Sequence, residues 1–154
     1  MLEQKAEEYV NVGKLKKEAA ALGQIEGLLR EAVIDLDEAQ KTQEIAAHRA
    51  TFFLAYMAML RAGRALLLLN GYRPAKCNQH KTIVEVTSLL MGDKASTIVV
   101  HFEEVRQKQH ALVHNHSNLI SELEAHDAFH YALLLVREIT KLIKKKDPDF
   151  HVSA

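Results

Sequence analysis

Residues 51–70 read TFFLAYMAMLRAGRALLLLN, the densest apolar stretch of the chain. Its apolar side chains cover most of the circumference of a helix, which is typical of a central helix that other elements cover on several sides. Arg61 and Arg64 interrupt the stretch, so we expect a buried helix over residues 44–70 and not a membrane span. Gly71 ends this helix, because glycine adopts the left-handed cap conformation without strain. Small side chains along the helix would let a neighbour approach closely: Ala55, Ala58, Ala62, Gly63 and Ala65.

Helical periodicity continues on both sides of this central segment. Apolar residues recur with a period near 3.6 over residues 19–43, and shorter patterns of the same kind cover residues 79–91 and 95–114. Cap-type residues at 115–118 precede a last helix over residues 119–145. Lysines in its final turn complement the negative end of the helix dipole.

The first part of the chain carries a weaker pattern. Residues 2–17 are polar, and Gly13 interrupts them, which predicts a marginal helix that needs a partner surface. No stretch has the period-2 alternation of a half-buried strand. We therefore expect an all-α, up-and-down helical bundle of five main helices plus a short N-terminal helix. Its length favours one domain over residues 1–154.

The composition limits the function classes. Lys plus Arg is 20 and Asp plus Glu is 20, so the zero net charge argues against a strongly basic nucleic-acid binder. Cys77 is the single cysteine, which excludes an intrachain disulfide and a cysteine-based zinc site. The chain begins without an apolar leader, and we expect a cytoplasmic protein that does not enter a membrane. Nine histidines are the unusual feature of the composition.

One group of chemically active residues lies in the helix predicted over residues 95–114. Glu103, Arg106, His110 and His114 fall on one flank of this helix, away from its apolar stripe. An arginine could stabilise charge on a phosphodiester while a histidine moves protons. The alternative interpretation is a solvated helix face of mixed charge.

A second histidine pair, His126 and His130, is also one helical turn apart, so a histidine-rich metal-binding bundle is a further alternative. His126 falls on the apolar stripe of the last helix, where a hydrogen-bonded core histidine is the commoner case. Neither a His-Glu-x-x-His motif nor a Glu-x-x-His step occurs in the chain. We therefore predict no metal site and no cofactor.

Two regions of the sequence resemble a known family. The stretch from Phe53 through Leu67, followed by Gly-Tyr-Arg-Pro at 71–74 and His-Lys at 80–81, resembles the HEPN family (higher eukaryotes and prokaryotes nucleotide-binding domain). Residues 105–114 are similar to the signature of its penultimate long helix, and the resemblance covers roughly residues 25–140. It implies an α-helical bundle that dimerises, with the signature helices meeting across a cleft. Many members are metal-independent ribonucleases, often toxins paired with a nucleotidyltransferase antitoxin, and others act as binding modules.

The signature departs from the family at its arginine. The family pattern Arg-Asn-x-x-x-His places Gln109, His110 and His114 at its three defined positions. Glutamine cannot supply the cationic fork, and Arg106 is the nearest arginine. The resemblance therefore favours a dimeric module with a degenerate motif, which binds nucleotide, RNA or a nucleotidyltransferase-type partner through Arg106, Lys108 and Gln109. The alternative is a metal-independent endoribonuclease that uses Arg106, His110 and His114 as catalytic residues.

Overall fold

The computed structural model describes residues 2–114 and 119–151, and over these residues the fold is an all-α helical bundle. Five main helices and a short N-terminal helix are present, as predicted. A 3₁₀ turn, η1 (Asp93–Ala95), lies between the fourth and fifth helices. The helices are α1 (Leu2–Asn11), α2 (Leu22–Glu44), α3 (His48–Leu69), α4 (Gln79–Met91), α5 (Ser96–His114) and α6 (Glu122–Lys146).

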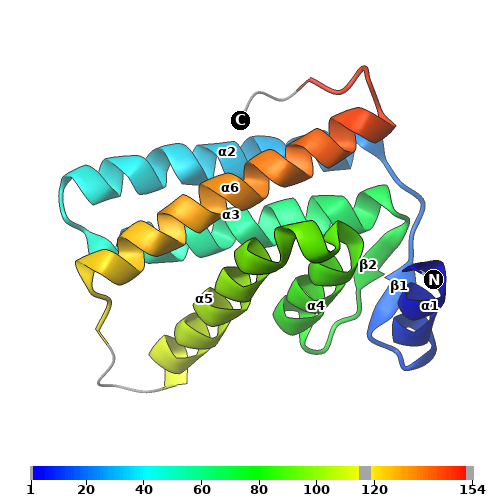
Figure 1. Ribbon diagram of the computed structural model, residues 1–154, viewed down its shortest axis with the longest axis horizontal. Coiled ribbons are helices and arrows are strands. Elements are labelled where there is room, and N and C mark those ends of the chain that lie inside the picture. The colour runs from blue at the N-terminus through cyan, green and yellow to red at the C-terminus, as the bar shows by residue number, and fades with distance from the viewer. Residues whose placement is uncertain (1, 115–118, 152–154) are drawn as a thin grey trace.

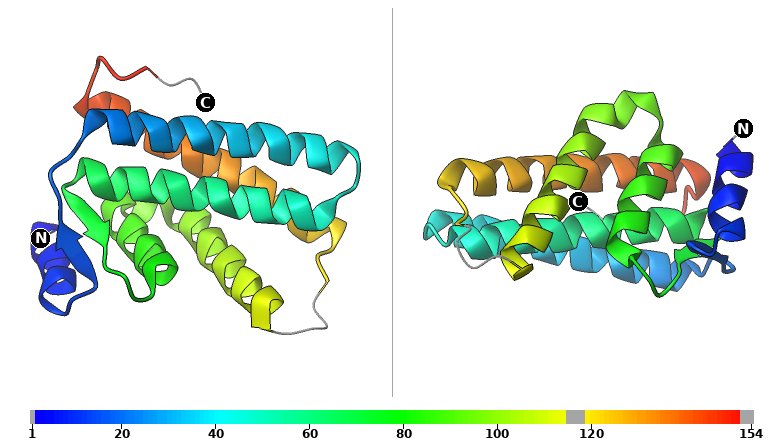
Figure 2. Two further views of the ribbon diagram at one scale, coloured as in Figure 1. Left: turned by 180° about the vertical axis from the view of Figure 1, so that it is seen from behind. Right: turned by 90° about the horizontal axis from the view of Figure 1, so that it is seen from below.

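The three long helices α2, α3 and α6 lie side by side along the longest axis of the molecule (Figure 1). Helices α4 and α5 project from one side of α3 and form a second, shorter layer (Figure 2). Helix α3 contacts all four of the other main helices, which explains why apolar residues surround it. It is long and apolar enough to cross a membrane, but 67% of its most apolar window is buried inside the protein, as in a core helix.

The small residues of α3 are buried, as expected. At Gly63 the approach is closest, because an added Cβ would lie 2.7 Å from Ile83 Cγ2 and 2.8 Å from Thr87 Oγ1. Both neighbours belong to α4, so a residue without a side chain sets the distance at which α4 crosses α3. This crossing decides where the beginning of α4 stands relative to the middle of α3.

Arg61 interrupts the apolar stretch of α3 because it pairs with a buried carboxylate on α2. Its Nη1 donates to Oδ2 of Asp35, whose side chain is 8% exposed, and its Nε lies 3.3 Å from Oε2 of Glu31. Burial raises the pKa of Asp35, and the hydrogen bond from Arg61 opposes that rise. The ion pair therefore joins the two helices that pack most extensively against each other.

Two predictions about the first segment were wrong. The N-terminal helix ends at Asn11, and Gly13 then adopts a φ of +77° that turns the chain. The next residues form a strand, β1 (Leu15–Lys17), which pairs antiparallel with β2 (Tyr72–Pro74). Three residues are too few to show a period, and the pairing depends on a partner far along the chain, so no local pattern indicated this sheet.

The beginning of the last helix also differs from the prediction. Helix α6 starts at Glu122, because Ser121 caps it in a reciprocal capping box with Glu124. The predicted cap at 115–118 lies outside the described residues, and Leu119, expected as the first residue of the apolar stripe, is 80% exposed.

The two halves of α5 have different environments. Val99, Phe102 and Val105 are its buried residues, and all three lie in the first half of the helix. From Arg106 to His114 no residue is buried, so the predicted stripe through Gln109 and Leu112 is only partly covered. In Figure 2 the C-terminal half of α5 extends away from α3. The fold thus presents the signature-like residues on a projecting helix.

Candidate functional site

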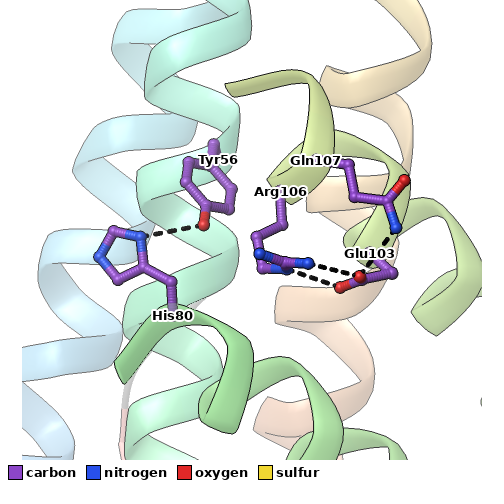
Figure 3. A network of polar contacts seen from close by, with 5 residues as sticks. All are labelled: Tyr56, His80, Glu103, Arg106 and Gln107. Atoms are coloured by element: carbon purple, nitrogen blue, oxygen red, sulfur yellow. Dashed lines mark hydrogen bonds and ion pairs between the residues drawn. The ribbon is translucent and has the colours of Figure 1, made fainter. Parts of the chain in front are cut away.

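All the site residues predicted from the sequence lie on α5, but they face different neighbours. Arg106, Lys108 and Gln109 are half-buried, and His110 and His114 are exposed. The Nζ of Lys108 lies 3.6 Å from Oε1 of Glu124 on α6, so this side chain faces the α6 side of α5. Arg106 faces the α3 and α4 side, as Figure 3 shows. The predicted binding residues Arg106 and Lys108 therefore lie on opposite flanks of the helix.

Arg106 is held by a carboxylate one turn earlier on the same helix. Its Nε donates to Oε2 of Glu103 at 2.8 Å, and its Nη2 donates to Oε1 at 2.7 Å. Gln107 Nε2 donates to the same Oε1 at 3.0 Å. These hydrogen bonds lower the pKa of Glu103 and raise that of Arg106, so both groups stay charged. Arg106 is thus bound in the two-pronged geometry that a phosphate would otherwise use.

The structure brings Tyr56 and His80 to this arginine, and sequence reasoning had given neither of them a site role. Tyr56 lies in the middle of α3 and is 2% exposed, and His80 lies in the first turn of α4. A hydrogen bond of 3.0 Å joins Tyr56 Oη and His80 Nδ1, and Arg106 lies between this pair and Glu103 (Figure 3). The signal in the sequence was Tyr56 itself, because a tyrosine buried in an apolar helix needs a polar partner.

The environment keeps both members of the Tyr56–His80 pair neutral. Burial raises the pKa of Tyr56 well above its ordinary value. Burial also lowers the pKa of His80, and the positive charges of Arg64 and Arg106 lower it further. A neutral imidazole and a phenol thus stand beside a guanidinium that a carboxylate has already neutralised. Of this pair Tyr56 is buried and His80 is exposed, so the imidazole is the member that a ligand can reach.

Arg106 and His114 are not close together within one chain. They are eight residues apart on α5, which is about 12 Å along a helix axis. His114 lies beside His110, and their ring centroids are 4.4 Å apart. One phosphodiester could not contact both Arg106 and His114 at hydrogen-bond distance in this geometry.

Three further described histidines, His101, His126 and His130, contact side chains of this chain. His126 was expected in the core, but it is exposed, and its Nδ1 lies 2.9 Å from Gln43 Nε2 on α2. His101 stacks on Tyr131 with ring centroids 3.6 Å apart, and His130 meets the same ring edge-on. The register of α6 on α2 placed His126 at the rim of the apolar stripe. Within 2–114 and 119–151, no three His, Cys, Asp or Glu side chains form a group that could hold a metal.

This geometry divides α5 into a partly buried network around Arg106 and an exposed histidine pair near its end. No protein-family model matches the chain, and no curated protein matches it either.

Proposed function

We propose that this chain is a HEPN-like, dimeric helical module that binds a phosphate-bearing ligand, a nucleotide or RNA, through α5 and the adjoining end of α4. The observation that carries the proposal is the double hydrogen bond between Arg106 and Glu103. It supports binding rather than cleavage, because the guanidinium is held by Glu103 in a partly buried network and, within one chain, is separated from His114.

A ribonuclease that uses Arg106 and His114 would need different geometry. Its arginine must be available to the phosphate in the transition state, and its acid or base must lie within hydrogen-bond reach of the same group. Here Glu103 accepts from two nitrogen atoms of Arg106, and within one chain the imidazole of His114 is two helical turns further along α5, so cleavage would require the His114 of a second copy. Gln109 at the arginine position of the family pattern agrees with a degenerate motif.

The proposed binding surface combines cations with neutral hydrogen-bonding groups. Lys81 on α4 is exposed and close enough to lower the pKa of Glu103, and His80 precedes it in the chain. His110 and His114 add two exposed imidazoles. A phosphate would compete with Glu103 for Arg106, so we expect moderate affinity with the salt dependence of an electrostatic contact.

The dimer is proposed from the second half of α5. None of the side chains from Arg106 to His114 is buried in a single chain, and Val113 is 68% exposed. The family resemblance implies that signature helices meet in a dimer, and a second copy would cover this part of α5. Sedimentation at micromolar concentration tests this part, because a species of monomer mass would contradict it.

The ligand proposal is tested with two substitutions that are expected to change RNA affinity in opposite directions. The probe is a fluorescent single-stranded RNA oligonucleotide, titrated without added metal at 50 and 200 mM salt. Arg106→Gln is expected to weaken binding about tenfold, as for the loss of one charge-assisted phosphate contact. Glu103→Gln is expected to strengthen binding, because it removes the carboxylate that competes for the guanidinium.

The matched control is the exposed ion pair between Glu138 and Lys141 on α6, whose Nζ–Oε1 distance is 3.0 Å. Glu138→Gln and Lys141→Gln repeat the two charge changes in another ion pair and are expected to leave RNA affinity unchanged. Absence of RNA binding, or equal effects of both pairs of variants, would contradict the proposed ligand class. RNA cleavage that His114→Ala abolishes would establish the ribonuclease alternative instead.

A further inference from the structure

A cavity of about 460 Å³ lies on the other flank of α3, between the first half of α2, the second half of α3, strand β2 and the start of α4. This volume is within the range of sites for small organic molecules. The Arg106 network does not line it, so it is a separate feature of the fold.

The cavity exists because α2 has a glycine where it faces this space. A Cβ built on Gly27 would have no atom within 4 Å, so no neighbouring side chain fills the position. Leu28 and Leu68 form apolar walls, and the ring of Tyr72 on β2 adds an aromatic surface. These walls therefore suit a ligand with a flat or short apolar group.

Two guanidinium groups line this cavity without the close carboxylate partners that Arg61 and Arg106 have. Among the residues that the structure describes, no carboxylate oxygen lies within 4.0 Å of Arg64, whose Nη2 contacts Gln79 Oε1 at 3.4 Å. Arg73 Nε is 3.8 Å from Glu18 Oε2, beyond hydrogen-bond distance. By contrast, Arg106 makes two short hydrogen bonds to Glu103.

The formal charges of the cavity lining balance, with two arginines and two glutamates. Glu18 and Glu31 line it together with Arg64 and Arg73. Glu31 is already paired with Arg61, at 3.3 Å, and Arg61 does not line the cavity. Among the described residues Arg64 has no carboxylate within 4.0 Å, and it lies beside apolar walls, a combination that can bind an anion attached to an apolar body.

We propose that this cavity binds a small organic anion, with its carboxylate or phosphate group between Arg64 and Arg73 and its apolar body against Leu28, Leu68 and Tyr72. Arginine binds carboxylate and phosphate groups with the same hydrogen-bond geometry. Probes that carry one or the other group distinguish between them. This site is additional to the proposed function and does not depend on it, because it uses other residues and another cavity.

The test titrates the full chain with phenyl phosphate, benzoate or inorganic phosphate. Isothermal titration calorimetry measures the affinity, and amide chemical shifts locate the site. At least one of the two aromatic anions is expected to bind more tightly than inorganic phosphate and to shift the amide signals of Gly27, Tyr72 and Gln79. Preference between phenyl phosphate and benzoate identifies the anionic group. If neither aromatic anion binds, or if the shifted signals lie elsewhere, the proposal is wrong.

Two glycines of α2 provide matched variants. Gly27→Leu places a side chain in the cavity, while Gly23→Leu makes the same change one helical turn earlier, outside the cavity and also in open space. Both variants are expected to fold, because leucine favours a helix more than glycine does. Gly27→Leu is expected to weaken binding of the aromatic anion at least about tenfold and Gly23→Leu to leave it unchanged, since a filled site excludes the ligand. Equal binding by the two variants would overturn the proposal.

The arginines provide a second, independent comparison. Arg64→Gln is expected to weaken binding about tenfold, and Arg49→Gln, an exposed position on the same helix, is expected to have no effect. Arg106→Gln separates this site from the proposed RNA surface: it is expected to bind phenyl phosphate or benzoate like the wild-type protein. If Arg106→Gln lost anion binding and Arg64→Gln kept it, the anion would sit on α5 and the assignment would be wrong.

Discussion

Each of the two helix layers contains an arginine that forms an ion pair, and the two ion pairs differ. One lies in the layer of α2, α3 and α6, and the other lies in the layer of α4 and α5. In the first layer Arg61 of α3 pairs with Asp35 of α2, whose side chain is buried. In the second layer Arg106 pairs within its own helix with Glu103, whose side chain is 34% exposed. The first ion pair joins elements, whereas the second holds one side chain in place beside solvent. The groups of the proposed RNA surface therefore lie in the layer with less buried surface, as is usual where a rigid scaffold supports a site.

The largest expected effect tests the first of these ion pairs. Arg61→Met is expected to lower the free energy of unfolding by about 3 kcal/mol, because it leaves the buried carboxylate of Asp35 without its partner. Arg106→Met in the second layer is expected to cost less than about 1 kcal/mol, since water reaches Glu103. Urea denaturation of both variants measures the two values. Equal losses would show that the layers do not differ in this way.

A second prediction concerns the contact between the layers. Gly63→Ala is expected to destabilise the protein by about 2 kcal/mol, because the added Cβ would overlap Ile83 and Thr87 where α4 crosses α3. Thermal or urea denaturation measures the loss. Combining this change with Thr87→Ala is expected to cost less than the two single changes added together, since one of the overlapping atoms is removed. Simple additivity in this double-mutant cycle would mean that the close approach is absent.

Replacing glycine by alanine at Gly27 is expected to stabilise the protein, by less than Gly63→Ala destabilises it. Gly27→Ala should raise the free energy of unfolding by about 0.5–1 kcal/mol, because alanine favours the helix and the added Cβ has open space. The measurement is the midpoint of urea denaturation, with an unchanged slope of the unfolding free energy against urea concentration. A loss of stability would show that α2 approaches its neighbours more closely here than the structure indicates.

The smallest expected effect is a pH dependence in the second layer. The pKa of His80 is lowered in the folded protein, so below the ordinary value of 6.5 the unfolded chain binds more protons than the folded one. His80 therefore makes stability fall as the pH drops from 7 through 6.5 towards the lowered pKa. His80→Asn removes this contribution, and its stability is expected to change less between pH 7 and 5.5 than that of the wild type. Parallel profiles from urea denaturation at each pH would contradict the neutral Tyr56–His80 pair.

The helices were predictable because each rests on a local pattern. Residues 79–91 were predicted with the bounds that α4 has, and the other main helices differ at their ends, where caps such as Ser121 decide the boundary. The pair of Glu103 and Arg106 was within reach of the sequence as well, since the two residues are one turn apart on one flank. The helical wheel placed both residues on that flank but did not predict the hydrogen bonds between them.

The site around Arg106 needed the tertiary structure. Tyr56 and His80 are far apart in the chain, and they meet only because α4 crosses α3 closely at Gly63. The same holds for the pairing of β1 with β2 and for Asp35 opposite Arg61.

The amino-acid sequence by itself determined the helical class, the central position of α3 and the polar character of α5, because hydrophobic periodicity acts over a few residues. Only the tertiary structure decided which flank of α5 faces α4, which arginines keep partners and where a cavity remains beside Gly27. These features depend on the distance and angle between packed helices, and side chains that are far apart in the chain set them jointly.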